Sequence, residues 1–300
     1  MIKPGIKLGP KNDLHRLENT GAKYCEVWYR IDKPEWYSNY FTFFKKNRIN
    51  SGLHYWGAVD QAYETNIAYP GEIQEKSIKL IEKCIDVAAQ NKCHYVNIHA
   101  GARKLTRLDM KTLRFNVDQY SLEVSEKDAD TAQKESLIHL SNYASDKGVL
   151  FLVETIPAKI HNKDTRHKPE PYYAMTSQNL LKRATQDNIS ITNDFCHTFS
   201  EEFEKPLDQL WKSLWDKTSK LAPYTKLLHI NTLVSPYNGT DTHHGITNED
   251  FEIDGIFPTK EKLKEALSLF RDRDDVWAIN EPSENHEDNY FSLKELINTL

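Results

Sequence analysis

The chain has few glycines, and it lacks a glycine-rich phosphate-binding fingerprint. Only 11 of its 300 residues are glycine, and no such run follows the first predicted strand. Dinucleotide sites and P-loops need closely spaced glycines so that the backbone can approach the phosphates. Both classes of nucleotide-binding site are therefore disfavoured.

Long apolar runs and an N-terminal leader are also missing. Residues 149–153 form one of the longest uncharged apolar runs, whereas a membrane-spanning helix needs ~20 such residues. The first ten residues lack the apolar core of a signal peptide. We therefore expect a soluble, cytoplasmic protein with no membrane partner.

Cysteines are few as well, and the chain has no excess of positive charge. Four cysteines without tight spacing are typical of reduced thiols in a cytoplasmic protein. The formal net charge of −5 argues against a generally basic nucleic-acid-binding surface, although a local basic patch remains open. No linker, low-complexity segment or repeat is visible, so we expect one domain over residues 1–300 and infer no obligate protein partner.

Short β-rich runs alternate with helical patterns along the whole chain. The expected strands are 6–8, 24–28, 49–54, 95–99, 149–154, 189–194, 227–231 and 276–281. Between them, a helical period marks residues 72–90, 129–146, 177–185, 206–221 and 259–270, with Ser177 and Thr259 as expected N-caps. This alternation predicts an α/β protein with a single (β/α)₈ TIM barrel. An open, doubly wound sheet is the competing fold.

The predicted strand ends and the loops after them carry imidazoles and carboxylates. These nine residues are His54, His99, Glu154, Asp194, His197, His229, Asp241, His243 and Glu281. The C-terminal ends of barrel strands meet at one mouth, where such enzymes have their active sites. An unpaired carboxylate is costly to bury, so the set favours bound metal. Imidazoles with carboxylates and no thiolate suit Zn²⁺, with Mn²⁺ and Fe²⁺ as alternatives. Cys196 is interpreted as packing, and His244 as peripheral.

The motifs GLHYWG, NIHAG, FLVETIP, NDFCH, LLHIN, TDTHHG and INEP together resemble the xylose isomerase-like barrel superfamily, and within it the endonuclease IV family. The resemblance implies three metal ions. His54, His99 and Glu154 would hold the first, and Glu154 would bridge to the second. The remaining ligands would be Asp194, His229 and Glu281 for the second ion, and His197, Asp241 and His243 for the third.

Two motifs depart from the endonuclease pattern. The endonuclease IV family has a motif similar to His-Ala-Pro-Tyr at the end of the third strand, in which an aromatic residue wedges into DNA. This chain has His54-Tyr55-Trp56-Gly57 instead. After the fifth strand, ETIP stands where Glu-Asn-Thr is expected. Abasic DNA and a smaller phosphodiester therefore both stay open as substrates.

Two basic segments follow the fourth and fifth predicted strands. The first contains Arg103, Lys104, Arg107, Lys111 and Arg114, and the second contains Lys159, Lys163, Arg166 and Lys168. They either bind phosphate oxygens at the mouth or are solvated loops. Aromatic residues near the mouth either stack on a substrate or pack the rim. The candidate substrate-binding residues are Tyr55, Trp56, Arg103, Lys104, Arg107 and Lys159.

We expect a metal-dependent hydrolase of phosphoester bonds, with up to three ions, in which Glu154 bridges two ions and Glu281 orients the water. A DNA-repair role would follow if the substrate is abasic DNA. The alternative is a mononuclear sugar isomerase or epimerase in which Glu154 and Glu281 exchange a proton. It uses Asp194 and His229 as further ligands but leaves His54, His99, Asp241 and His243 without a role. A third class is a carbohydrate- or nucleic-acid-binding barrel with a relict site.

Overall fold

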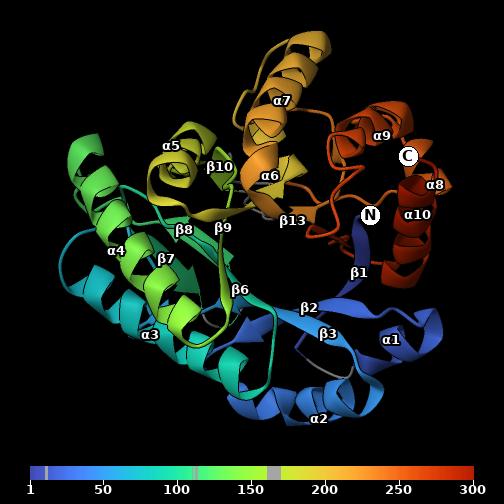
Figure 1. Ribbon diagram of the computed structural model, residues 1–300. Coiled ribbons are helices and arrows are strands. Elements are labelled where there is room, and N and C mark those ends of the chain that lie inside the picture. Colours follow the sequence, from blue (N-terminus) through green and yellow to red (C-terminus); the bar gives the residue numbers. More distant parts are fainter. Residues whose placement is uncertain (11–12, 110, 112–113, 161–169) are drawn as a thin grey trace.

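The computed structural model describes residues 1–10, 13–109, 111, 114–160 and 170–300. Its centre is a closed barrel of eight parallel strands in the order β1-β16-β13-β12-β9-β6-β3-β2 (Figure 1). The strands are β1 (Lys3–Leu8), β2 (Tyr24–Arg30), β3 (Asn50–Trp56), β6 (Tyr95–His99), β9 (Leu150–Glu154), β12 (Ser190–Asp194), β13 (Thr225–His229) and β16 (Trp277–Asn280). The predicted (β/α)₈ barrel is confirmed.

Helices surround the barrel, with at least one after each strand (Figure 1). In chain order the outer helices are α1 (Leu14–Thr20), α2 (Ser38–Asn47), α3 (Glu72–Gln90), α4 (Glu126–Asp146), α5 (Ser177–Asp187), α7 (Leu207–Leu221), α9 (Lys260–Ser268) and α10 (His286–Asn298). Within the described residues, no helix is both long enough and apolar enough to cross a membrane.

Five of these helices were predicted, and their ends reflect capping side chains. Thr259 caps α9 as expected, because its hydroxyl accepts a hydrogen bond from the Lys262 amide. For α5 the predicted cap was wrong by one residue, because the hydroxyl of Thr176 and not Ser177 accepts from the Asn179 amide. Helix α4 begins at Glu126, three residues before its predicted start, because Ser125 caps it.

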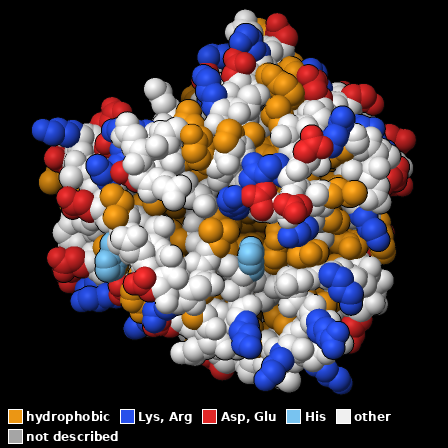
Figure 2. Space-filling model, viewed as in Figure 1, with side chains coloured by type: hydrophobic (Ala, Val, Ile, Leu, Met, Phe, Trp, Pro, Cys, Tyr) orange, Lys and Arg blue, Asp and Glu red, His pale blue; other side chains and the backbone are white. Residues whose placement is uncertain are grey.

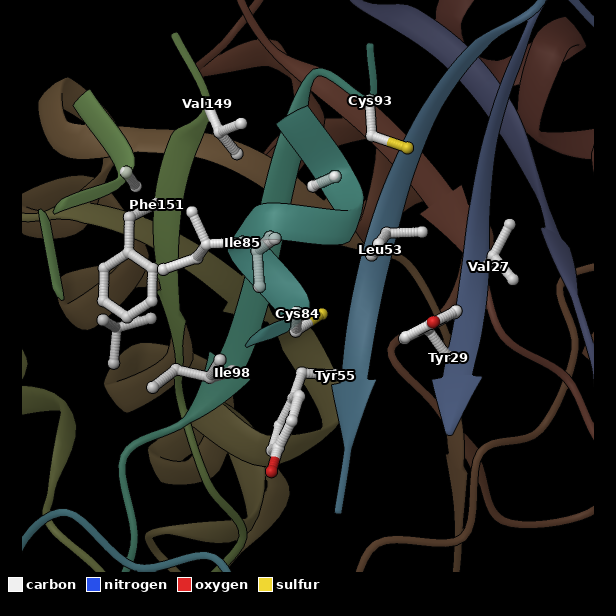
Figure 3. Packing of buried hydrophobic residues seen from close by; sticks show 14 of the residues in the cluster. Val27, Tyr29, Leu53, Tyr55, Cys84, Ile85, Cys93, Ile98, Val149 and Phe151 are labelled. Atoms are coloured by element: carbon white, nitrogen blue, oxygen red, sulfur yellow. The ribbon is translucent and has the colours of Figure 1, made fainter. Parts of the chain in front are cut away.

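The alternation of side chains along β3 separates the core from the mouth. Leu53 and Tyr55 belong to the apolar layer between the barrel and α3, together with Cys84 and Ile85 (Figure 3). His54 pairs in register with Trp28, and both residues line a cavity at the mouth of the barrel. Because successive strand residues face opposite sides of the sheet, Leu53 and Tyr55 pack outward in the layer with α3, whereas His54 faces the interior of the barrel.

Aromatic residues close the barrel floor beneath these inward groups. Tyr95, Trp277 and Ile279 form a buried cluster there. On the face of the molecule seen in Figure 1, exposed hydrophobic side chains lie among charged ones (Figure 2). Gly52 makes room for the ring of Tyr95, since a Cβ at that position would overlap it. The candidate site residues lie at the other end of the barrel, where the strands end.

Short strands extend the loops around the mouth. One sheet has the order β4-β5-β7-β8, and two further pairs are β10-β11 and β14-β15. Their bounds are β4 (Ala58–Val59), β5 (Tyr63–Glu64), β7 (Thr106–Asp109), β8 (Arg114–Val117), β10 (Lys159–Ile160), β11 (Glu170–Pro171), β14 (Leu233–Val234) and β15 (Ile256–Phe257). The first basic segment, expected as a loop, thus forms a hairpin of β7 and β8. In the second, Lys163, Arg166 and Lys168 lie outside the described residues.

Candidate metal centre

The structure brings the nine predicted imidazoles and carboxylates together at one end of the barrel. Eight of the nine, together with Glu26, form overlapping groups, and within each group the ligand atoms lie within 4.8 Å of one another. These groups are His54, His99 and Glu154; Glu154, Asp194, His229 and Glu281; Asp194, His197 and His243; and Glu26, His54, His229 and Glu281. The first two match the ligand sets that the resemblance implied.

The third group differs slightly from the expected set. Asp194 joins His197 and His243 in it, where Asp241 was expected. Asp241 is nevertheless adjacent, because its Oδ2 lies 2.9 Å from Nε2 of His243 and 3.4 Å from Nε2 of His197. Either carboxylate can therefore complete this group.

Glu154 lies at the centre of the cluster. Its side chain is fully buried, and Oε1 lies 3.1 Å from Nδ1 of His229, 3.3 Å from Nδ1 of His197 and 3.6 Å from Nε2 of His99. Oε2 lies 3.5 Å from Nε2 of His54. One carboxylate thus faces four imidazoles, an arrangement suited to bridging two ions.

A hydrogen-bond chain across the barrel orients Glu154. The Asn97 amide donates to Oε2 of Glu154, and the Thr192 hydroxyl donates to Oδ1 of Asn97 at 2.8 Å. All three side chains are buried. Supporting contacts of this kind fix the direction of a ligand's lone pairs.

Asp194 couples the cluster to a short helix, α6 (Phe195–Ser200). Its Oδ1 accepts a hydrogen bond from the His197 amide at 3.0 Å and caps the helix. Oδ2 points instead at His243 and His229, 3.3 and 3.6 Å from their ring nitrogens. His243 itself has a φ of +41°, a strained conformation that often marks functional sites.

Two charged residues of the cluster were missed by sequence reasoning. Glu26 accepts a hydrogen bond from the Lys7 ammonium at 2.5 Å, and its Oε2 lies 2.8 Å from Nε2 of His229. Lys7 also contacts Nδ1 of His54 at 2.7 Å and the carboxylate of Glu281. Both lie within strands, not at their ends. A charged residue at an inward position of an apolar strand was the available signal.

The cluster has more carboxylates than fixed positive charges. Five carboxylates face one ammonium, which leaves a formal charge of −4 when the imidazoles are neutral. One divalent ion would leave −2, two would bring neutrality, and three would give +2. Buried charge must be compensated, and both divalent ions and protons on the imidazoles can compensate it. The carboxylates are Glu26, Glu154, Asp194, Asp241 and Glu281.

Without metal, protons on the imidazoles supply part of this compensation. Burial alone would lower the pKa of His243, but Asp241 and Asp194 outweigh it and raise the pKa to about 10. Burial opposes charge on Glu154 too, yet His229 and His54 hold its pKa well below the usual value. Metal binding must therefore displace protons from the cluster.

Four buried atoms of the cluster have no hydrogen-bond partner of good geometry within the described residues. They are Oε1 of Glu26, Nε2 of His99, Oδ2 of Asp194 and Nε2 of His243. Buried polar atoms normally have partners. Each of these atoms belongs to one of the ligand groups, so the residues present fit divalent ions such as Zn²⁺.

A cavity of about 360 Å³ leads to the cluster. His54, His99, His243 and Glu281 line its inner side, and Trp28, Trp56 and Glu64 are among its other walls. Glu64, another residue missed by sequence reasoning, accepts a hydrogen bond from the Tyr172 hydroxyl at 2.6 Å. Burial raises the pKa of Glu64 to about 7, although the Tyr172 hydrogen bond opposes the shift.

The predicted substrate-binding residues divide into two sets. Tyr55 and Trp56 line the cavity. The four basic residues do not occur among the described residues lining it, and their charged groups meet other neighbours. Arg103 pairs with Glu123 at 3.0 Å, Arg107 with Asp118 at 3.0 Å and Lys159 with Glu204 at 3.6 Å, while Lys104 lies over the Tyr173 ring.

Solved structures with a similar fold include both hydrolytic and isomerising enzymes. A D-tagatose 3-epimerase-like protein has a TM-score of 0.65 at 13% identity, covering 99% of this chain and 97% of that one. Endonuclease IV from Thermus thermophilus has a TM-score of 0.60 at 16% identity, covering 99% of both chains. A further protein from the same organism, soaked with zinc chloride, has a TM-score of 0.59 at 15% identity, covering 100% of this chain and 99% of that one. These likenesses show the fold alone.

Comparison with curated proteins found no significant match. A family model described as xylose isomerase-like TIM barrel matches residues 14–294, which is nearly the whole chain. The chain belongs to the xylose isomerase-like TIM barrel family.

Proposed function

We propose that the protein is a metal-dependent hydrolase of small phosphoesters that holds at least two divalent ions in the barrel mouth. The observation that carries this proposal is the convergence of five carboxylates and five imidazoles around a single ammonium. With two or three ions bound, the formal charge becomes neutral or positive. Such a site favours an anionic substrate.

The ions, when bound, would supply Lewis acidity toward phosphoryl oxygens and would activate a water molecule. The protein's own groups have distinct tasks. Glu154, oriented by Asn97, would bridge two ions. Glu281 lines the cavity, and its Oε2 lies 3.3 Å from Nδ1 of His229, so its carboxylate would orient the attacking water and accept its proton.

The cavity supports a small substrate over a DNA duplex. Its volume of about 360 Å³ is that of a small-molecule pocket. Indole rings of Trp28 and Trp56, with centroids 5.9 Å apart, form part of its wall. The basic residues expected to follow a phosphate backbone pair with acidic neighbours instead. A phosphate monoester or a small diester is therefore our preferred substrate class.

An epimerase is the second candidate, and one observation favours it. Glu154 and Glu281 both approach Nδ1 of His229, at 3.1 and 3.3 Å, within a four-residue ligand group. Two carboxylates near one ion suit proton exchange beside a carbonyl, and a structural neighbour is a D-tagatose 3-epimerase-like protein. The epimerase mechanism gives no task to four residues of the cluster, which are His54, His99, Asp241 and His243.

The test is an assay of the zinc-loaded and manganese-loaded protein on p-nitrophenyl phosphate, a small aryl phosphodiester, abasic oligonucleotide and a panel of ketoses. We expect hydrolysis of a small phosphoester, lowered at least ~100-fold in Glu281→Gln. Glu284→Gln, which changes an exposed carboxylate in the same loop, is the matched control and should keep full activity. Ketose epimerisation without phosphoester hydrolysis would replace the proposal by its alternative.

A further inference from the structure

The ammonium of Lys7 is held by three acceptors inside the barrel. Its Nζ lies 2.5 Å from Oε2 of Glu26 and 2.7 Å from Nδ1 of His54, and it also donates to Oε1 of Glu281. A lysine ammonium has three protons and no lone pair. Every donor of Lys7 is therefore in use, which leaves none for a substrate.

These acceptors are the same residues that form the fourth candidate ligand group. Glu26, His54, His229 and Glu281 present ligand atoms within 4.8 Å of one another. His229 joins them because its Nε2 lies 2.8 Å from Oε2 of Glu26. By chemistry this group would hold a divalent ion, but the Lys7 ammonium is already bound to three of its four members.

We infer that Lys7 is a built-in cation that takes the place of a metal ion in this group and limits the centre to the other three groups. The inference rests on the proposed function, because it requires that the centre binds metal. Lys7 is a positioning residue in this account. It is hydrogen-bonded to Glu281 and His54, and it competes with any ion that would bind them through the same atoms.

A substitution that removes the ammonium should open the fourth group. In Lys7→Met, a chain of similar length has no charge, so Glu26 and Glu281 lose their cation. We expect this variant to bind one more zinc equivalent per chain than the wild type, counted by elemental analysis after loading and gel filtration. Lys7→Arg keeps a positive charge and should show the wild-type count.

A double variant identifies the site of the added ion. Lys7→Met with Glu26→Gln removes the ammonium and also one carboxylate that only the fourth group uses. The count should return to the wild-type value. An unchanged count in Lys7→Met, or an added ion that persists in the double variant, would overturn the inference.

A measurement on the wild type covers the case in which Lys7→Met does not fold. With ¹⁵N-labelled lysine, the hydrogen-bonded ammonium of Lys7 should give a protected NMR signal that persists on zinc loading; Lys7→Arg assigns it. Loss of that signal on loading would mean that an ion displaces Lys7, contrary to the inference. A wild type that binds no metal at all would instead refute the proposed function.

Discussion

A neutral side chain sets the direction of the central carboxylate. Asn97 donates to Glu154 and is itself held by the Thr192 hydroxyl. Removing the amide leaves Oε2 of Glu154 free to rotate away from the position that bridges two ions. We expect Asn97→Ala to weaken zinc binding about 10- to 100-fold, measured by titration against a competing chelator.

Asn193 provides the matched control for that substitution. It is also a buried asparagine of the barrel, but its amide bonds to Thr218 and its carbonyl accepts from Thr198. Asn193→Ala should lower stability and leave zinc affinity unchanged. Equal zinc affinities for the wild type and Asn97→Ala would refute the orienting role.

The raised pKa of Glu64 predicts how the stability of the protein depends on pH. Its pKa in the folded protein is raised from 4.5 to about 7, so the stability that it contributes at low pH is lost as the pH rises through that range. Glu64→Gln should therefore be more stable than the wild type by about 1–3 kcal/mol above pH ~8, with little difference below pH ~5. Chemical denaturation at the two pH values tests this.

Tyr172→Phe should change the stability of the protein in the opposite direction to Glu64→Gln. The Tyr172 hydroxyl favours the charged form of Glu64, so its removal should lower stability most above neutral pH. A pH-independent effect of either substitution would mean that Glu64 does not titrate in this range.

Residues at strand ends could be found from sequence, whereas those within strands were missed. His54, His99 and Glu154 end predicted strands, and the fold alone is enough to bring such positions together. Lys7 and Glu26 lie inside β1 and β2, where their contacts depend on the register of neighbouring strands. Their distances to His54 and His229 follow only from barrel closure. Which of these residues bind metal stays a prediction.

At the scale of elements, Asp194 has two roles that substitution can separate. Its Oδ1 caps α6, and its Oδ2 faces the ligand groups. Asparagine is a good N-cap but a poor metal ligand, whereas alanine can neither cap a helix with its side chain nor bind a metal ion. Both Asp194→Asn and Asp194→Ala should lose bound zinc, and the metal-free Asn variant should be more stable than the Ala variant by about 1 kcal/mol.

Thermal unfolding of the two metal-free variants, together with their zinc content, measures these effects. Equal stabilities would show that the cap contributes nothing. Full zinc retention in Asp194→Asn would remove Asp194 from the ligand groups.

Helices with a regular apolar stripe were predicted, whereas α1, α2 and the 13-residue α10 were not. Helix α3, with a regular apolar stripe over 19 residues, was predicted with its observed ends. Helix α1 has only seven residues, and α2 is rich in aromatic residues with weak helical propensity. The two-residue strands β4 and β5 are too short for any periodicity, so the sheet that places Glu64 over the mouth could not be foreseen.

At the scale of the whole molecule, metal removal should make stability sensitive to alkaline pH. His243 has its pKa raised from 6.5 to about 10, and those of His197 and His229 are also raised by their carboxylate neighbours against the effect of burial. Stability from such groups is complete below pH ~6.5 and is lost as the pH rises toward ~10.

The metal-free protein should therefore melt several degrees lower at pH ~9.5 than at pH ~6.5, while the zinc-loaded protein should change much less because ions replace those protons. Thermal unfolding of both forms at the two pH values checks the sign. Equal pH dependence of the two forms would contradict the competition between protons and metal.

The multi-ion centre is tested most directly by the metal content of the wild-type protein, purified without chelator and measured by elemental analysis. With neutral imidazoles, five carboxylates around one ammonium leave a formal charge of −4, which two divalent ions would balance. A content of two to three equivalents, mainly zinc, is the result that the charge balance predicts. A content of one equivalent or less after loading with excess zinc would contradict the multi-ion centre.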